Sequence, residues 1–160
     1  MFRVAPFLLF ALASPLAAKT SLGIFDGWGA FRDGQRCYAI AIPETTGRTA
    51  LPGAFASVGT WPSHGVRGQV HIRLSRNTAQ GAQVRLRIGR QSFVLKGSGR
   101  EAWAKDKAMD AAIAAAMRSA ERMRVSSISR AGRRFTDTVA LAGAASALDA
   151  ATLGCARRRR

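Results

Sequence analysis

The sequence contains few acidic residues, histidines and cysteines. Among 160 residues there are nine aspartates and glutamates, two histidines and two cysteines. A glycosidase-type site needs two carboxylates that converge in a cleft, and the spacing of the acids marks no such pair. His64 and His71 have no third ligand at a spacing that suits a metal ion. We therefore expect a non-enzymatic protein without a metal site or a cofactor.

The chain also lacks an apolar run as long as the roughly 20 residues that a helix needs to span a bilayer. Its most apolar stretch, residues 4–12, follows Arg3 and precedes a small-residue segment that ends at Ala18. A positive start, a short apolar core and a small-residue end are typical of a secretory signal peptide. We predict that residues 1–18 are removed and that the protein is periplasmic or secreted, with no membrane span after cleavage. A buried N-terminal strand and a membrane anchor are the alternatives.

Positive charge is in large excess, since 25 lysines and arginines give a formal net charge of +16. Arg3 and the four terminal arginines, residues 157–160, hold five of these charges, which leaves +11 on the body between them. We expect residues 156–160 to form a disordered basic tail. A domain with this much positive charge attracts nucleic acid, anionic lipid or acidic glycans. Only four of the 25 are lysines, however, so a bias toward GC-rich codons explains the excess equally well.

The two cysteines lie near the two ends of the predicted mature domain, residues 19–155. Exported domains form and keep disulfides, so we predict a bond between Cys37 and Cys155. It would close a loop of more than one hundred residues and stabilise the fold by about 4–5 kcal/mol. Two independent thiols are the alternative. A catalytic Cys37–His71–Asp137 triad can be written, but no local nucleophile motif supports it.

Alternating apolar and polar residues predict that most of the chain forms strands with one buried face. The expected strands cover residues 27–32, 36–42, 54–61, 70–75, 84–88, 93–96, 123–130 and 134–141. Apolar residues three and four apart predict helices at about 106–120, with Asp106 as N-cap, and at about 144–153, ended by Gly154. The predicted class is α+β, mainly β: one antiparallel, sandwich-like domain of roughly seven strands with two helices. We expect Cys155 to point from the last helix toward the strand of Cys37.

One surface feature concerns four side chains that fall on the polar side of their strands. Alternation places Arg73, Arg85 and Arg87, with His71 nearby, on the polar face of adjacent strands, where we expect them to form a small cationic surface. Such a surface is a candidate for binding a polyanion, whether nucleic acid, anionic lipid or glycan. Single-stranded nucleic acid also needs aromatic side chains between the charges, and here the aromatics fall on core-type positions or near turns. A solvated polar face is the alternative interpretation.

Asp137 is the acid that strand alternation directs toward the core, because it shares its side with Phe135, Val139 and Leu141. A buried carboxylate needs a partner. We predict a structural anchor that is bound by an arginine or by backbone amides.

The order of these features resembles a known family. Gly27-Trp28 opens the mature part, Cys37 follows, and the strand at 135–141 leads through a Leu-x-Gly turn into an alanine-rich helix. The chain resembles the invasion-associated locus B proteins over residues 24–155, most closely over 135–155. The resemblance implies an exported, β-sandwich-like domain without known catalytic residues and, in pathogens, a role in host-cell invasion. Family members usually carry mid-chain cysteines, which are absent here. We expect the protein to bind an envelope component or a partner protein.

Overall fold

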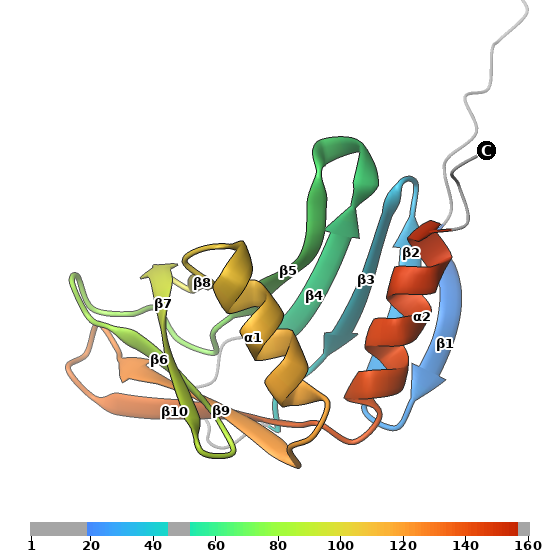
Figure 1. Cartoon of the computed structure of the whole chain (residues 1–160). Coiled ribbons are helices and arrows are strands. Elements are labelled where there is room, and N and C mark those ends of the chain that lie inside the picture. Colours follow the sequence, from blue (N-terminus) through green and yellow to red (C-terminus); the bar gives the residue numbers. More distant parts are fainter. Residues whose placement is uncertain (1–18, 45–51, 157–160) are drawn as a thin grey trace, which may run out of the picture.

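Ten antiparallel strands form one continuous sheet in the computed structural model of the chain, which describes residues 19–44 and 52–156 (Figure 1). In sheet order the strands are β1 (Thr20–Phe25), β2 (Trp28–Asp33), β3 (Arg36–Ala41), β4 (Phe55–Trp61), β5 (Val66–Arg73), β8 (Glu101–Trp103), β7 (Gln91–Ser98), β6 (Val84–Ile88), β9 (Arg122–Ile128) and β10 (Arg134–Ala140). A 3-10 turn, η1 (Pro62–His64), connects β4 to β5. The expected class, α+β and mainly β, is confirmed. The predicted signal peptide and the terminal arginines lie outside the described residues.

Strand alternation places the apolar residues on one face of the sheet. In β6, for example, Val84, Leu86 and Ile88 are buried, whereas Arg85 and Arg87 are exposed. The alternation does not predict β1 or β8. The first contains a glycine and the second has only three residues, so neither is long and regular enough to show a period of two. The sheet therefore has ten strands rather than roughly seven.

The sheet bends where the short strand β8 joins its two halves. The first half consists of β1 to β5, and the second consists of β6, β7, β9 and β10. The edge strand β10 returns to the first half, because the Glu44 amide donates to the Thr138 carbonyl oxygen (2.7 Å) and the buried Trp28 indole donates to the Ala140 carbonyl oxygen (2.8 Å). The inner faces of both halves thus share one hydrophobic core. The sandwich-like packing comes from one sheet that folds over.

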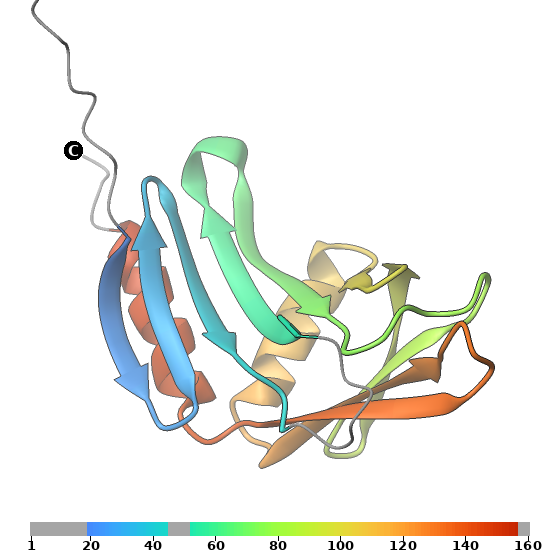
Figure 2. The same ribbon diagram turned by 180° about the vertical axis from the view of Figure 1, so that it is seen from behind.

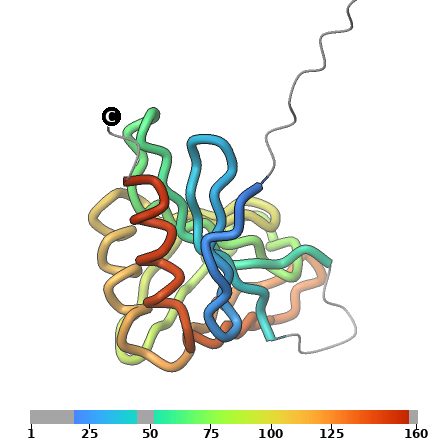
Figure 3. Tube along the Cα trace, turned by 90° about the vertical axis from the view of Figure 1, so that its right-hand side faces the viewer, coloured from blue at the N-terminus to red at the C-terminus, as the bar shows by residue number. Residues whose placement is uncertain are grey.

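Two helices lie on the inner side of this sheet (Figures 1 and 3). The helix α1 (Lys107–Met117) packs against β5, β6 and β7, and α2 (Ala144–Ala156) packs against β1 to β4. Asp106 is the N-cap of α1, as predicted, and its carboxylate accepts a hydrogen bond from the Met109 amide (2.8 Å). Neither of these helices is long and apolar enough to cross a membrane, within the ranges that the structure describes.

The second helix extends three residues beyond its predicted end. Gly154 does not terminate α2, and Ala156 belongs to the helix rather than to the tail. The glycine instead permits a close approach, because a Cβ atom at this position would lie 2.5 Å from the Cδ1 atom of Leu22. Its role is therefore packing against β1, and Cys155 is held inside a helical turn.

Candidate binding groove between the two helices

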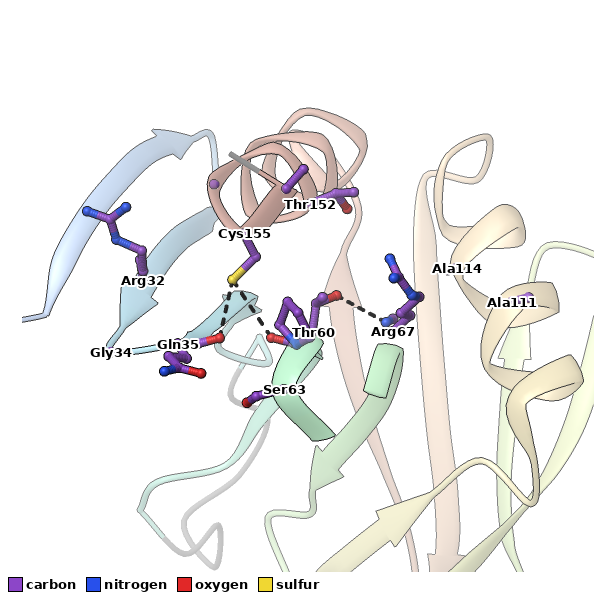
Figure 4. Close-up of a pocket in the computed structure, with 14 residues that line it drawn as sticks. Arg32, Gly34, Gln35, Thr60, Ser63, Arg67, Ala111, Ala114, Thr152 and Cys155 are labelled. Carbon is purple, nitrogen blue, oxygen red and sulfur yellow. Dashed lines mark hydrogen bonds between the residues drawn. The ribbon is translucent and has the colours of Figure 1, made fainter. Parts of the chain in front are cut away.

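A groove of about 1030 Å³ lies between α1 and α2 (Figure 4). The residues that the two helices contribute are alanine, glycine, threonine and cysteine, so neither helix fills the groove with a long side chain of its own. The other walls come from the β2–β3 turn, the η1 turn and the ends of β4 and β5. The lining consists of Arg32, Gly34, Gln35, Thr60, Pro62, Ser63, Arg67, Gly68, Ala111, Ala114, Thr152, Gly154, Cys155 and Ala156.

Strand pairing aligns three of the inner-face residues at this end of the sheet. Arg32 of β2 is opposite Cys37 of β3, which is opposite Thr60 of β4. Directly paired residues in antiparallel strands present their side chains on the same face. Arg32 and Thr60 therefore flank the buried Cys37 on the side that α2 covers.

The disulfide between Cys37 and Cys155, a confirmed prediction, joins α2 to this row. The Cα atoms of the two cysteines are 5.8 Å apart, and the bond spans 118 residues of sequence. The Cys155 sulfur also lies 3.6 Å from the Gln35 carbonyl oxygen and 4.0 Å from that of Thr60. A disulfide sulfur carries no proton, so these are contacts rather than donated hydrogen bonds. The bond thus forms part of the groove wall.

The groove carries positive charge on two sides. Figure 4 shows Arg32 and Arg67 on opposite sides of Cys155 and Thr60. These arginines are the ionisable side chains among the described lining residues. Hydroxyl groups lie between them, and the Thr60 hydroxyl already accepts a hydrogen bond from the Gly68 amide (3.1 Å). The groove therefore offers guanidinium and hydroxyl donors to an anionic guest.

An ion pair connects the two helices that form the groove. Arg118, which caps the C-terminus of α1, donates a hydrogen bond to Asp149 on α2 (2.7 Å). This bond lowers the pKa of the Asp149 carboxyl and raises the pKa of the Arg118 guanidinium. Both side chains are largely exposed, so the pair contributes little to the stability of the fold.

A buried carboxylate fixes α1 to the sheet. Asp110 accepts a hydrogen bond from the Val70 amide (2.8 Å). Val70 precedes His71 on β5, and His71 forms the last pair of β5 with β8, opposite Trp103. Burial raises the pKa of the Asp110 carboxyl; the Val70 amide opposes this rise, and the charge of Asp106 adds to it. Sequence reasoning assigned Asp110 only to a helix. Its position among the apolar residues of the helix stripe was the available signal.

The structure corrects the predicted cationic surface. Arg73 and His71 lie on β5, whereas Arg85 and Arg87 lie on β6, and the strands β8 and β7 separate the two pairs. The strands were assumed to be adjacent because they are consecutive in sequence, but the chain inserts β7 and β8 between them. Glu101 moreover binds both members of the first pair, at 2.7 Å from His71 Nε2 and 3.2 Å from Arg73 Nε.

His71 also has aromatic neighbours. Its ring stacks on Trp103, with centroids 5.0 Å apart and planes 2° from parallel, and Phe55 approaches it edge-on at 5.1 Å. Together with Glu101, these contacts make His71 part of a packed outer cluster. The Cys37–His71–Asp137 triad, which no local motif supported, does not form. Cys37 is in the disulfide, His71 contacts Glu101 and Asp137 binds Ser75.

Asp137 is buried and accepts hydrogen bonds from the Ser75 amide (2.8 Å) and the Ser75 hydroxyl. The Ser75 amide is a backbone amide, one of the two kinds of partner predicted from the sequence for this buried carboxylate. Its role as a structural anchor stays a prediction. No cluster of three metal-binding side chains occurs within residues 19–44 and 52–156.

The sequence reasoning missed both groove arginines. Arg32 follows Trp28 and Ala30 at intervals of two, so alternation could have placed it on the inner face. No local signal marks Arg67, because segments distant in sequence form the groove around it.

A sequence model of the family described as "Invasion associated locus B (IalB) protein" matches residues 32–152, which is most of the chain. The chain belongs to the IalB family. A solved structure, the crystal structure of invasion associated protein B from Bartonella henselae, has the same fold with a TM-score of 0.60. At 16% sequence identity, it aligns with 84% of this IalB-family chain and 96% of its own. The comparison with curated protein sequences finds no match.

Proposed function

We propose that this IalB-family chain is an exported, non-enzymatic protein that binds an acidic segment of an envelope partner protein in the groove between α1 and α2. The observation that carries the proposal is the lining of the groove. Its ionisable groups, Arg32 and Arg67, are guanidinium groups, which present several N–H donors and no acceptor, and its cysteine is bonded to Cys37. Such a lining suits the recognition of a carboxylate more than catalysis.

Three observations support export. The first 18 residues have the pattern of a secretory signal peptide. The disulfide suits an oxidising compartment, since cytosolic thiols are kept reduced. Proteins of the IalB family are also generally exported. A role in invasion, which the name of the Bartonella henselae protein suggests for that protein, stays a prediction for this chain.

The size of the groove supports a peptide segment as the guest. A volume of about 1030 Å³ lies just above the range for small-molecule sites, about 300–1,000 Å³. The groove is open between two helices, and its arginines lie on opposite sides of it. An extended segment with acidic side chains would reach both arginines at once.

The test uses two substitutions on the same exposed surface of α1. Ala111 lines the groove, whereas the neighbouring Ala112 is exposed and does not. Envelope extracts are passed over the mature protein and over its Ala111→Trp and Ala112→Trp variants. We expect to recover a partner that the Ala112→Trp variant still binds and the Ala111→Trp variant does not. The Arg67→Glu variant should bind this partner at least tenfold more weakly (about 1.4 kcal/mol per tenfold), because its new carboxylate would repel the acidic segment. Equal recovery by the two tryptophan variants would contradict the proposal.

A further inference from the structure

The second half of the sheet carries a group of positive charges on the side away from the helices. We call this group the outer cationic face; its members are Arg85, Arg87, Lys96, Arg122, Arg124 and Arg134. All six side chains are exposed, while the residues between them on the same strands point inward. Figure 2 views the sheet from this side, with α1 behind it.

Two of these arginines face each other directly. Arg87 of β6 is opposite Arg124 of β9 in the strand register. Like charges at directly opposed positions destabilise a sheet, since their Cβ atoms lie only about 5 Å apart. No ion pair within the described residues involves any of the six cations, and Arg85 has a neutral partner, the Gln83 side chain, at 3.3 Å. Among the residues that the structure describes, no acid therefore offsets this repulsion through an ion pair.

Most of the acidic side chains bind groups outside the outer cationic face. Asp33, Glu101 and Asp149 form ion pairs with cations outside the face. Asp106, Asp110 and Asp137 bind backbone amides. The acids nearest in sequence or register lie at the borders: Glu121 precedes β9, Glu44 pairs with Thr138 of β10, and Glu101 lies on β8. The centre of the face has no acid of its own.

We propose that the outer cationic face binds the headgroups of an anionic phospholipid bilayer, with a phosphate between Arg87 and Arg124. An anion there would convert the repulsion between the two arginines into two charge-assisted hydrogen bonds. Several cations spread over four strands match a planar array of headgroups, and each cation near an anionic surface strengthens binding about fivefold.

The side chains of the face favour a bilayer over nucleic acid. Single-stranded nucleic acid requires aromatic side chains among the charges. In β6, β9 and β10 no aromatic residue shares the outer side with the cations. Trp103, which is opposite Lys96 at the border of the face, already stacks on His71. Ile128, which is opposite Arg134 in the register, is 39% exposed on the same side. An exposed apolar side chain beside cations can enter the boundary between headgroups and acyl chains.

The test measures binding of the full mature chain, tail included, to vesicles of phosphatidylcholine alone and of equal parts phosphatidylcholine and phosphatidylglycerol. We expect binding to the anionic vesicles only, weakened by added salt. Arg87→Gln/Arg124→Gln should bind about 25-fold more weakly, while its melting temperature stays the same or rises, because the repulsion is gone. Ile128→Asn should lower vesicle affinity several-fold and leave heparin affinity unchanged.

The matched control is Lys105→Gln/Lys107→Gln, which removes two exposed charges at the start of α1, outside the face. It should bind vesicles nearly as well as the parent protein. An equal loss in this control would show that only net charge matters and would overturn the proposal. Tighter binding to single-stranded DNA through the same arginines, or an absence of binding to anionic vesicles at low salt, would also overturn it.

Discussion

At the residue scale, the carboxylate of Asp137 holds the connection after β5 against β10. The Ser75 amide and hydroxyl both donate to it, and the site is buried. We expect Asp137→Asn to lower the free energy of unfolding by about 1–3 kcal/mol, because the amide has one oxygen where the carboxylate has two, so one of the two buried Ser75 donors loses its acceptor. Thermal denaturation measures this loss. Asp149→Asn, which alters an exposed acid, is the control and should melt close to the parent. Unchanged melting and unchanged function of Asp137→Asn would refute the anchor.

The second buried acid should respond in the opposite way. Burial raises the pKa of Asp110 above its ordinary value of 3.8, so the native state binds this proton more tightly than the unfolded state does. The stability that Asp110 contributes is therefore largest below pH 3.8 and is lost as the pH rises through the raised pKa. Asp110→Asn keeps an oxygen for the Val70 amide and removes the charge. We expect it to be as stable as the parent or more stable at neutral pH.

The check on Asp110 is a comparison of unfolding free energies from pH 3 to pH 8, a range that brackets the ordinary carboxyl value of about 4. The advantage of Asp110→Asn over the parent should grow with pH. Asp110→Ala, which leaves the Val70 amide without an acceptor, should lose about 1–3 kcal/mol. A parent that gains stability relative to Asp110→Asn as the pH rises would contradict the account.

At the element scale, the turn from β10 into α2 depends on Gly143. Its φ is 80°, and a Cβ atom there would overlap the Phe25 carbonyl oxygen. Gly132, in the β9–β10 turn, has a similar φ of 71° but nothing within 4 Å of that position. We expect Gly132→Ala to cost about 1–2 kcal/mol, from conformation alone, and Gly143→Ala to cost clearly more. Equal losses in chemical denaturation would show that the close approach is unimportant.

The disulfide is the covalent link between α2 and the sheet. Its loop of 118 residues predicts that Cys37→Ser/Cys155→Ser loses up to about 5 kcal/mol of stability. The loss should be concentrated in α2, whose amides should exchange hydrogen faster, while α1 keeps its protection. Hydrogen exchange followed by mass spectrometry resolves the two helices. If the amides of α2 in the variant were as well protected from exchange as those of α1, packing alone would hold α2 on the sheet.

At the scale of the whole molecule, local patterns predicted the elements, but not how they are arranged. Period-two alternation identified β6 and β9 because each buries one face, and the apolar stripe identified α1. The arrangement could not be predicted in this way, because β7 and β8 lie between β5 and β6 in the sheet although they follow β6 in the chain. This long-range pairing split the predicted cationic surface.

The candidate groove was harder to predict for the same reason. Cys37 and Cys155 were found because an exported chain with two cysteines favours a bond. Arg67 becomes a groove residue only when two helices from later in the sequence pack beside it. A surface made of four distant segments has no local pattern.

We propose that this protein is an exported domain that its disulfide closes around a binding groove. The most direct measurement is the intact mass of the protein from fractionated cells, alkylated first without and then with reductant. We expect a chain outside the cytoplasm that begins at Lys19, takes up no alkylating group before reduction and takes up two after it. A full-length cytoplasmic chain with both cysteines alkylated before reduction would contradict it.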